Sequence, residues 1–149
     1  SRVLETMKLV KSLPYEGFWF TQFDSISLAA LPVVRGGKCC CHVFQNDDQN
    51  YKASFFVHPP WGLGYDALRR FIYEAAKYPI DCEHGIMDRW MAFLLESGFI
   101  TVTPTNEWSW SANSIDSPAL IQDCRNAIAG GAKFVHGVKN AEHLHAILQ

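Results

Sequence analysis

A run of prolines and glycines near the middle of the chain, Pro59-Pro60-Trp61-Gly62-Leu63-Gly64, separates two different hydrophobic patterns. Most of the chain between Pro14 and this run is typical of strands, and Tyr51–His58 alternates cleanly between apolar and polar residues, as a half-buried strand does. After the run the apolar residues recur at helical spacing, beginning with Tyr65–Tyr78. Strands and helices that are gathered in separate parts of a chain are typical of α+β folds. We therefore predict an α+β fold in which this run ends the strand-rich part.

The strand-rich part is expected to form a four-strand antiparallel meander after an N-terminal helix at Val3–Leu13. Pro14 ends the helix, because the residue before a proline is driven out of helical backbone geometry. Gly36-Gly37 is a typical two-residue hairpin turn. Pro32 cannot donate to a sheet and indicates an edge strand or a bulge. The four predicted strands are Gly17–Phe23, Ile26–Val34, Lys38–Gln45 and Tyr51–His58.

The helix-rich part is expected to hold four helices, a β-hairpin and one short strand. The helix at Tyr65–Tyr78 places Leu68, Phe71 and Ile72 on a buried stripe and turns Glu74 toward water. The other predicted helices are 85–97, 117–129 and a C-terminal helix at 141–148; the hairpin pairs Phe99–Thr103 with Glu107–Ser111, and the short strand is Ala132–His136. Neither a repeat nor a linker interrupts the sequence, so residues 1–149 are expected to form a single domain.

Composition excludes several classes of protein. The chain has 149 residues, 48% of them hydrophobic, which is too apolar for a disordered protein. No run approaches the roughly 18 apolar residues that a membrane span needs. The 13 basic and 15 acidic residues leave no electrostatic footprint for nucleic acid. Five cysteines, three of them consecutive, do not fit a disulfide scaffold, so we expect reduced thiols and a cytoplasmic location.

The most conspicuous chemical group is the run Cys39-Cys40-Cys41-His42, together with Cys82 and His84. On a strand Cys39 and Cys41 project from one face, and Cys82 or His84 could complete a tetrahedral site of the kind that zinc occupies. The C-x-C and C-x-H spacings differ from those of zinc fingers and ribbons, and a buried cysteine commonly packs as a small hydrophobic residue. We therefore predict no metal and no other cofactor, and Cys39, Cys41, Cys82 and His84 are the candidate ligands if a metal binds.

The same region offers an enzymatic alternative with Cys82 as the nucleophile. Cys82 lies just before the predicted helix 85–97, where the helix N-terminus favours a thiolate. A catalytic cysteine also needs a base, and His84 and His136 are candidates for that role. No family signature supports the arrangement, so a Cys/His-dependent hydrolase or transferase is an alternative hypothesis and not the preferred one.

Two patterns associated with nucleotides and nucleic acids are incomplete. Gly62 and Gly64 precede a helix, but the third glycine and the lysine of a phosphate-binding loop are missing, so we assign both glycines to backbone shape. The segment Tyr65–Ser111 superficially resembles the recognition helix and wing of winged-helix DNA-binding domains. Its supposed recognition helix offers Arg89 as its one cation, whereas phosphate contacts need several. DNA binding is therefore a second alternative, and we expect no nucleic-acid partner.

Aromatic residues give the best indication of function. Trp108 and Trp110 share one face of their predicted strand, while Trp61 lies in the proline–glycine run and Tyr51 begins a strand. Such residues ordinarily pack in the core, but Trp and Tyr are also enriched at binding hot spots. We therefore predict a non-enzymatic protein, of accessory or immunity type by analogy, that binds a partner protein or a small apolar ligand through Trp61, Trp108, Trp110 and Tyr51. The sequence does not fix its oligomeric state.

Overall fold

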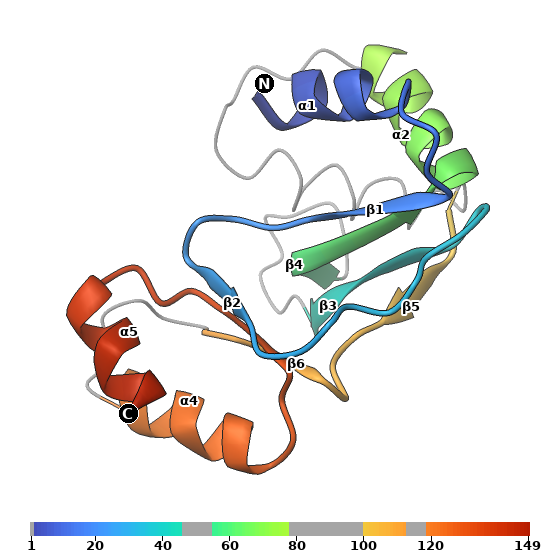
Figure 1. Ribbon diagram of the computed structural model, residues 1–149. Helices are drawn as coiled ribbons and strands as arrows, with labels where there is room; N and C mark the ends of the chain where they lie inside the picture. Colours follow the sequence, from blue (N-terminus) through green and yellow to red (C-terminus); the bar gives the residue numbers. More distant parts are fainter. Residues whose placement is uncertain (1, 46–54, 78–99, 113–118) are drawn as a thin grey trace.

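The computed structural model describes residues 2–45, 55–77, 100–112 and 119–149, and it confirms the α+β class (Figure 1). The helices in these ranges are α1 (Arg2–Val10), α2 (Tyr65–Lys77), α4 (Leu120–Ala129) and α5 (Ala141–Leu148). The first sheet has the described strands β1 (Gly17–Phe20), β4 (Phe55–Gly64), β3 (Cys39–Gln45) and β5 (Val102–Pro104), in that order. The second sheet has the described strands β2 (Ser25–Ser27), β7 (Phe134–His136) and β6 (Ser109–Ser111), in that order.

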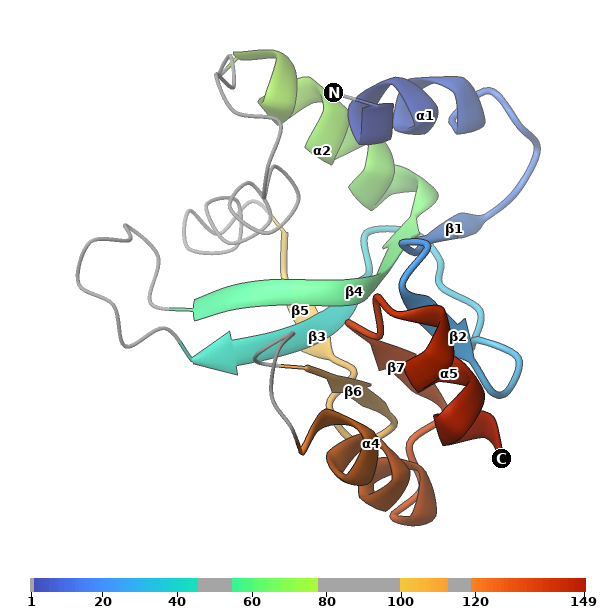
Figure 2. The same cartoon turned by 90° about the vertical axis from the view of Figure 1, so that its left-hand side faces the viewer.

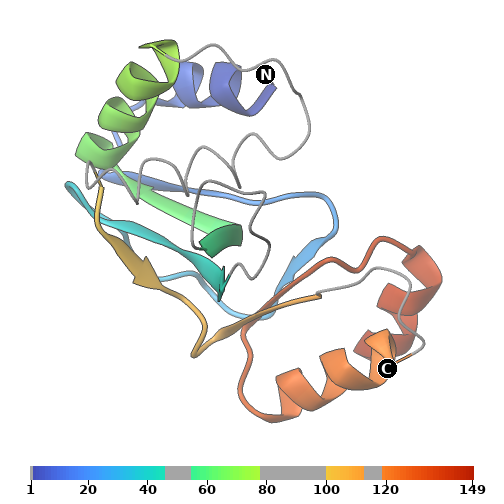
Figure 3. The same ribbon diagram turned by 180° about the vertical axis from the view of Figure 1, so that it is seen from behind.

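Each sheet packs against its own pair of helices. Helices α1 and α2 lie on the first sheet (Figure 1). The apolar core between the helices and this sheet contains Met7, Leu63 and Phe71. Helices α4 and α5 lie against the second sheet, where Cys124 and Val135 belong to another apolar cluster (Figure 3). The two sheets contact each other where β3 and β4 meet β6 and β7 (Figure 2). None of the helices in the described ranges combines the length and the apolar character that a bilayer crossing requires.

The predicted pairing of the third and fourth strands is confirmed, because β3 and β4 are antiparallel with His42 opposite His58. The next pair joins Cys40 to Gly62, so a single residue of β3 faces the three residues Pro59–Trp61 of β4. This bulge accommodates two prolines inside a strand, although neither can donate to the ladder. The prediction that the proline–glycine run ends the strand is therefore wrong.

The predicted four-strand meander is wrong in its connections. Strand β1 pairs with β4 and not with its neighbour in sequence, and β2 pairs with β7 in the second sheet. Residues 28–38 form no strand, so Gly36-Gly37 does not join a hairpin. Pro32 explains part of this difference, because it lacks an N–H for a ladder and its carbonyl instead accepts a hydrogen bond from the indole of Trp19.

The predicted hairpin at residues 99–111 is also wrong, because its two strands enter different sheets. Strand β5 runs parallel to β3 in the first sheet, and β6 runs parallel to β7 in the second. Asn106 lies between them, and its side-chain amide donates to the carbonyl of Val43 and accepts from the N–H of Val43, at 2.9 Å each. The amide thus continues the hydrogen bonding of β3 as another strand would. The wing on which the DNA-binding alternative depended is not formed.

Helix α2 follows the prediction to within one residue, and the predicted stripe around Leu68 is buried. Glu74 is the exception, because we expected it in water and it is buried. Its carboxylate lies 3.3 Å from Nε of Arg70 and 3.7 Å from Nζ of Lys77. These two cations compensate the buried charge of Glu74. The pattern of polar and apolar residues along the helix does not show such pairing, so it did not predict that Glu74 is buried. The C-terminal helix has the predicted bounds, and the predicted helix 85–97 lies outside the described residues.

Gly64, at the end of β4, lies against the backbone of the loop that precedes β3. A Cβ atom at this position would stand 2.3 Å from the carbonyl carbon of Arg35 and from the carbonyl oxygen of Gly36. We expect Gly64→Ala to lower the free energy of unfolding by about 3 kcal/mol through overpacking, as measured by urea denaturation. Gly37→Ala is the control, because a Cβ there meets nothing within 4 Å. Equal losses in the two variants would contradict this account.

Candidate functional site

Three histidines from three strands gather where the two sheets contact each other. His42 lies on β3, His58 on β4 and His136 on β7, and Ser109 and Ser111 hydrogen-bond to them from β6. The two serines are two residues apart on one strand, so they share a face of it. Four of these residues are buried and His58 is half-buried. We call the five residues the histidine seam.

One end of the seam joins His42 to Ser109. Nδ1 of His42 lies 2.7 Å from Oγ of Ser109. That hydroxyl donates to the carbonyl oxygen of Thr105 at 2.9 Å, so Nδ1 of His42 carries the hydrogen that the serine oxygen accepts. The hydroxyl of Thr105 lies 2.8 Å from the same oxygen. These bonds hold the segment between β5 and β6 against β3.

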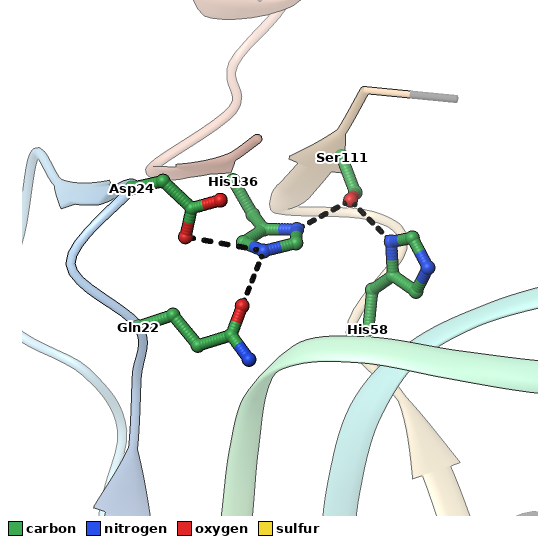
Figure 4. A network of polar contacts seen from close by, with 5 residues as sticks. All are labelled: Gln22, Asp24, His58, Ser111 and His136. Carbon is green, nitrogen blue, oxygen red and sulfur yellow. Dashed lines mark hydrogen bonds and ion pairs between the residues drawn. The ribbon is translucent and has the colours of Figure 1, made fainter. Parts of the chain in front are cut away.

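The other end of the seam is centred on Ser111. Its hydroxyl oxygen lies 2.8 Å from Nδ1 of His58 and 2.8 Å from Nδ1 of His136 (Figure 4). The opposite nitrogen of His136, Nε2, lies 3.1 Å from Oε1 of Gln22 and 3.4 Å from Oδ1 of Asp24. Gln22 and Asp24 come from the connection between β1 and β2. Ser111 therefore bridges the two sheets, and His136 carries the contact on to that connection.

The donors and acceptors around Ser111 determine where the protons lie. Oε1 of Gln22 accepts a hydrogen bond from Nε2 of His136, and the Asp24 carboxylate beside the same nitrogen has no hydrogen to donate. Nε2 therefore carries a hydrogen, and Nδ1 of the same ring is the acceptor. The hydroxyl of Ser111 therefore donates to His136 and accepts from Nδ1–H of His58. This arrangement requires a neutral His136, since a protonated imidazole has no acceptor nitrogen.

Burial keeps the three rings neutral at neutral pH. Burial, followed by the nearby His136 and His42, lowers the pKa of His58 to about 4. Burial, followed by His136, also lowers the pKa of His42 to about 4, and a hydrogen bond to Ser109 opposes this shift. Burial lowers the pKa of His136 as well; Asp24 opposes the shift and Lys139 adds to it. All three shifts follow from the difficulty of charging a group that water does not solvate.

The contacts Ser111–His136–Asp24 follow the order of a serine–histidine–acid triad, in which the serine donates to the ring and the ring to the acid. The ring nitrogens are exchanged relative to that triad, because the serine lies on Nδ1 and the acid on Nε2. Ser111 is only 5% exposed, and its oxygen also accepts from His58. A nucleophile must be able to approach its substrate closely. As folded, this arrangement joins the sheets and does not attack a substrate.

The predicted metal ligands do not converge in the described part of the chain. Cys39 and Cys41 lie fully buried in the core of the first sheet, where they pack as small hydrophobic residues. Cys82 and His84 lie outside the described residues. Within the ranges that the structure describes, no three His, Cys, Asp or Glu side chains are placed to hold a metal ion.

The enzymatic alternative with Cys82 stays a prediction, because its nucleophile lies outside the described residues. Its candidate base His136 already has partners at both ring nitrogens. Two of the described thiols are poor nucleophiles: burial raises the pKa of Cys40, and it raises the pKa of Cys124 to about 11. The thiolate is the reactive form of cysteine, so these thiols do not replace Cys82 in the hypothesis.

The four aromatic residues predicted to bind a partner do not form one surface in the described part of the chain. Trp61 is 1% exposed and belongs to the core of the first sheet, so its place on a binding surface is wrong. The cause is the continuation of β4, which carries Trp61 into the core that α2 covers. Trp108 packs edge-on against Trp19, with ring centroids 5.7 Å apart, and Trp110 packs against the core of the second sheet. Tyr51 lies outside the described residues.

Sequence reasoning selected His136 but missed its partners. Ser109 and Ser111 alternate with two tryptophans, so the polar face of that strand was visible in the sequence. Gln22 and Asp24 carry no such signal, because they reach His136 only through the pairing of β2 with β7.

No protein-family model, curated protein or solved structure matches this chain.

Replacing Ser111 by alanine tests the bridge. The change leaves Nδ1 of both His58 and His136 without its partner in the seam, and unpaired buried polar groups are costly. We expect the free energy of unfolding to fall by about 3 kcal/mol, as measured by urea denaturation. Ser25→Ala is the matched control, because the buried hydroxyl of Ser25 has no hydrogen-bond partner in the described part of the chain. A similar loss in both variants would show that the bridge does not stabilise the fold.

Stability should fall with acidification through the pH range of the seam histidines. The pKa of His42 and of His58 is about 4 in the folded protein and roughly 6.5 in the unfolded chain. The unfolded chain therefore takes up protons first, so the stabilisation is complete above pH 6.5 and is lost as the pH falls toward 4. Each histidine contributes at most about 1.4 kcal/mol per pH unit, and less where water reaches the ring.

Urea denaturation at pH 7.5, 6.5, 5.5 and 4.5 measures this slope. The double variant His42→Asn/His58→Asn should lose less stability across the range than the wild type. Replacing the exposed His145 by asparagine is the control and should leave the slope unchanged. Parallel curves for the wild type and the double variant would be inconsistent with the seam as the acid-sensitive element.

Proposed function

We propose that this protein is a non-enzymatic interaction protein that binds a partner protein by inserting the ring of Phe23 into an apolar pocket. The observation that carries the proposal is the position of Phe23. Its side chain is 92% exposed, yet it lies between Gln22 and Asp24, which both contact His136 of the seam. A large apolar ring is thus held in water on a segment that is fixed at both sides.

The backbone around Phe23 forms a closed turn. The N–H of Ser25 donates to the carbonyl of Gln22 at 3.1 Å, which places Phe23 at the tip. The carbonyl of Asp24 accepts from the N–H groups of Gly137 and Val138, at 3.0 and 3.2 Å. The turn is therefore joined to the end of β7 by backbone hydrogen bonds as well as by side chains.

Other exposed aromatic residues in the described ranges have partners of their own. The ring of Tyr15 packs edge-on against Phe18, and the ammonium of Lys77 lies 4.2 Å from the ring centre of Tyr73. Both tyrosines are less exposed than Phe23, at 63% and 59%. An isolated exposed apolar residue is common in proteins, so exposure alone supports little. Phe23 is favoured as the binding residue because its side chain is almost completely exposed and its backbone is fixed.

A fixed ring is a favourable binding anchor. Binding normally orders side chains and loops at the interface, and this ordering weakens the affinity. Because the Phe23 turn is already ordered, little conformational entropy is lost when it binds. An aromatic side chain buried in the partner is also typical of binding hot spots. A ring that projects from a turn fits a pocket on a partner protein better than it fits a small ligand, which needs a concave site of its own.

The proposal keeps the expected class of accessory or immunity-type protein but moves its binding residue. Trp61 is buried, so Phe23 replaces it as the principal aromatic contact. A cytoplasmic location remains part of the proposal, because the sequence leads us to expect reduced thiols. The Cys82-dependent enzyme remains the alternative.

Phe23→Ala should abolish most of the affinity for the partner without destabilising the protein. A photo-crosslinking p-benzoylphenylalanine at position 23, compared with the same group at position 73, identifies the partner in an extract of the host cell. With the purified partner, calorimetry should give at least a tenfold weaker affinity for Phe23→Ala, as expected for a hot spot. The unfolding temperature should not change, because the ring is already in water.

Tyr73→Ala is the control and should bind the partner as the wild type does. An affinity that Phe23→Ala leaves unchanged, or that both variants weaken equally, would contradict the proposal.

A further inference from the structure

The Ser111 hydroxyl limits how many protons the seam can accept. A serine hydroxyl has one hydrogen to donate and an oxygen that accepts. In the neutral seam it donates to Nδ1 of His136 and accepts from Nδ1–H of His58 (Figure 4). Both nitrogens lie 2.8 Å from the same oxygen, so the protonation of one ring determines the hydrogen bond that the other can make.

A first added proton is compatible with the bridge when it resides on His136. Nδ1–H of His136 then donates to Ser111, and the serine hydrogen turns to Nδ1 of His58. His58 takes the tautomer in which Nε2 carries the hydrogen and Nδ1 accepts. Asp24 stabilises the added charge, because its Oδ1 lies 3.4 Å from Nε2 of His136 and makes no hydrogen bond within the described part of the chain. The carboxylate therefore has an unused acceptor beside the ring.

A second proton, on His58, is incompatible with the bridge. Two N–H groups would then point at the oxygen of Ser111, and the serine hydrogen would lose its acceptor in the seam. The rings of His58 and His136 have centroids 5.3 Å apart, so two buried positive charges would also repel each other. Among the described residues, His42 from β3 and Lys139 after β7 add positive charge, and Asp24 is the acid that opposes it.

We propose that acidification breaks the Ser111 bridge, displaces His136 and releases the Phe23 turn, so that the partner dissociates at acid pH. This inference rests on the proposed function of Phe23. The route of coupling is short. His136 is the residue that the side chains of Gln22 and Asp24 contact, and its neighbours Gly137 and Val138 donate to the carbonyl of Asp24. Movement of His136 therefore removes the side-chain and backbone contacts of the turn together.

Hydrogen exchange of single amides tests the release without the partner. The amides of Gly137 and Val138 report on the turn, because they donate to Asp24, and amides in the middle of α2 report on the rest of the fold. Between pH 7 and pH 4.5 we expect the protection factors of Gly137 and Val138 to fall at least tenfold more than those of α2. With the purified partner, the affinity should weaken at least tenfold over the same range.

His58→Asn is the decisive variant, because an asparagine amide can donate to Ser111 but does not take up a proton. It should keep the protection of Gly137 and Val138 at pH 4.5, whereas His145→Asn should behave as the wild type. If His58→Asn does not fold, Ser111→Ala takes its place. That variant should have weak protection at these amides already at pH 7, with no further loss on acidification.

The outcomes separate the two proposals. The acid release would be overturned if the wild type and His58→Asn lost protection at Gly137 and Val138 equally, or if the wild type lost no more protection there than in α2. If Phe23→Ala still weakens binding at pH 7, the proposed function stands in either case. An affinity at pH 7 that is indifferent to Phe23→Ala would overturn the proposed function, and the acid release of the partner with it.

Discussion

The hydroxyl of Ser111 has a single hydrogen, and the contact between the two sheets depends on where that hydrogen lies. The hydroxyl connects the imidazole of His58 on β4 to the imidazole of His136 on β7. The polar atoms of both rings must be paired when they are buried. The bridge also fixes the register of β6. A shift by one residue would present Trp110 to the seam in place of the serine, because successive strand residues point to opposite faces. Hydrogen bonding in the seam and packing behind β6 therefore specify the same register.

The seam is polar because each sheet already has an apolar core with its own helices. Little apolar surface is needed between the sheets, so directional bonds specify how they meet. The chain passes from one sheet to the other at three connections, between β1 and β2, between β2 and β3, and between β5 and β6. In the β1–β2 connection Gln22 and Asp24 contact His136, and in the β5–β6 connection Asn106 makes two hydrogen bonds with Val43. These two connections are thus fixed by their own side chains, each of which contacts a strand of one sheet.

Local periodicity predicted the elements better than their partners. The bounds of α2 and α5 follow from helical spacing, and strand alternation placed Cys39 and Cys41 on one face, which lies in the core. The sheets were not predictable in the same way. The pairings of β3 with β5 and of β6 with β7 are parallel. Parallel strands are not joined by a short hairpin turn, so no turn residues in the sequence indicate which strands pair. For the site, His136 was selected as a base for a distant thiol, whereas its partners are a serine and a turn that only the fold brings near.

The likeness of Ser111–His136–Asp24 to a catalytic triad and the acid sensitivity of the seam have one physical origin. In both cases a serine proton is shared with a ring whose other nitrogen lies near a carboxylate. A hydrolase uses this arrangement by admitting a substrate to the serine, and here His58 occupies the oxygen and the fold covers it. A proton needs much less access than a substrate, so the buried arrangement can still respond to pH. Because the chain of contacts ends at the residues on either side of Phe23, a change in the Ser111 bridge is transmitted to the most exposed aromatic ring of the described surface.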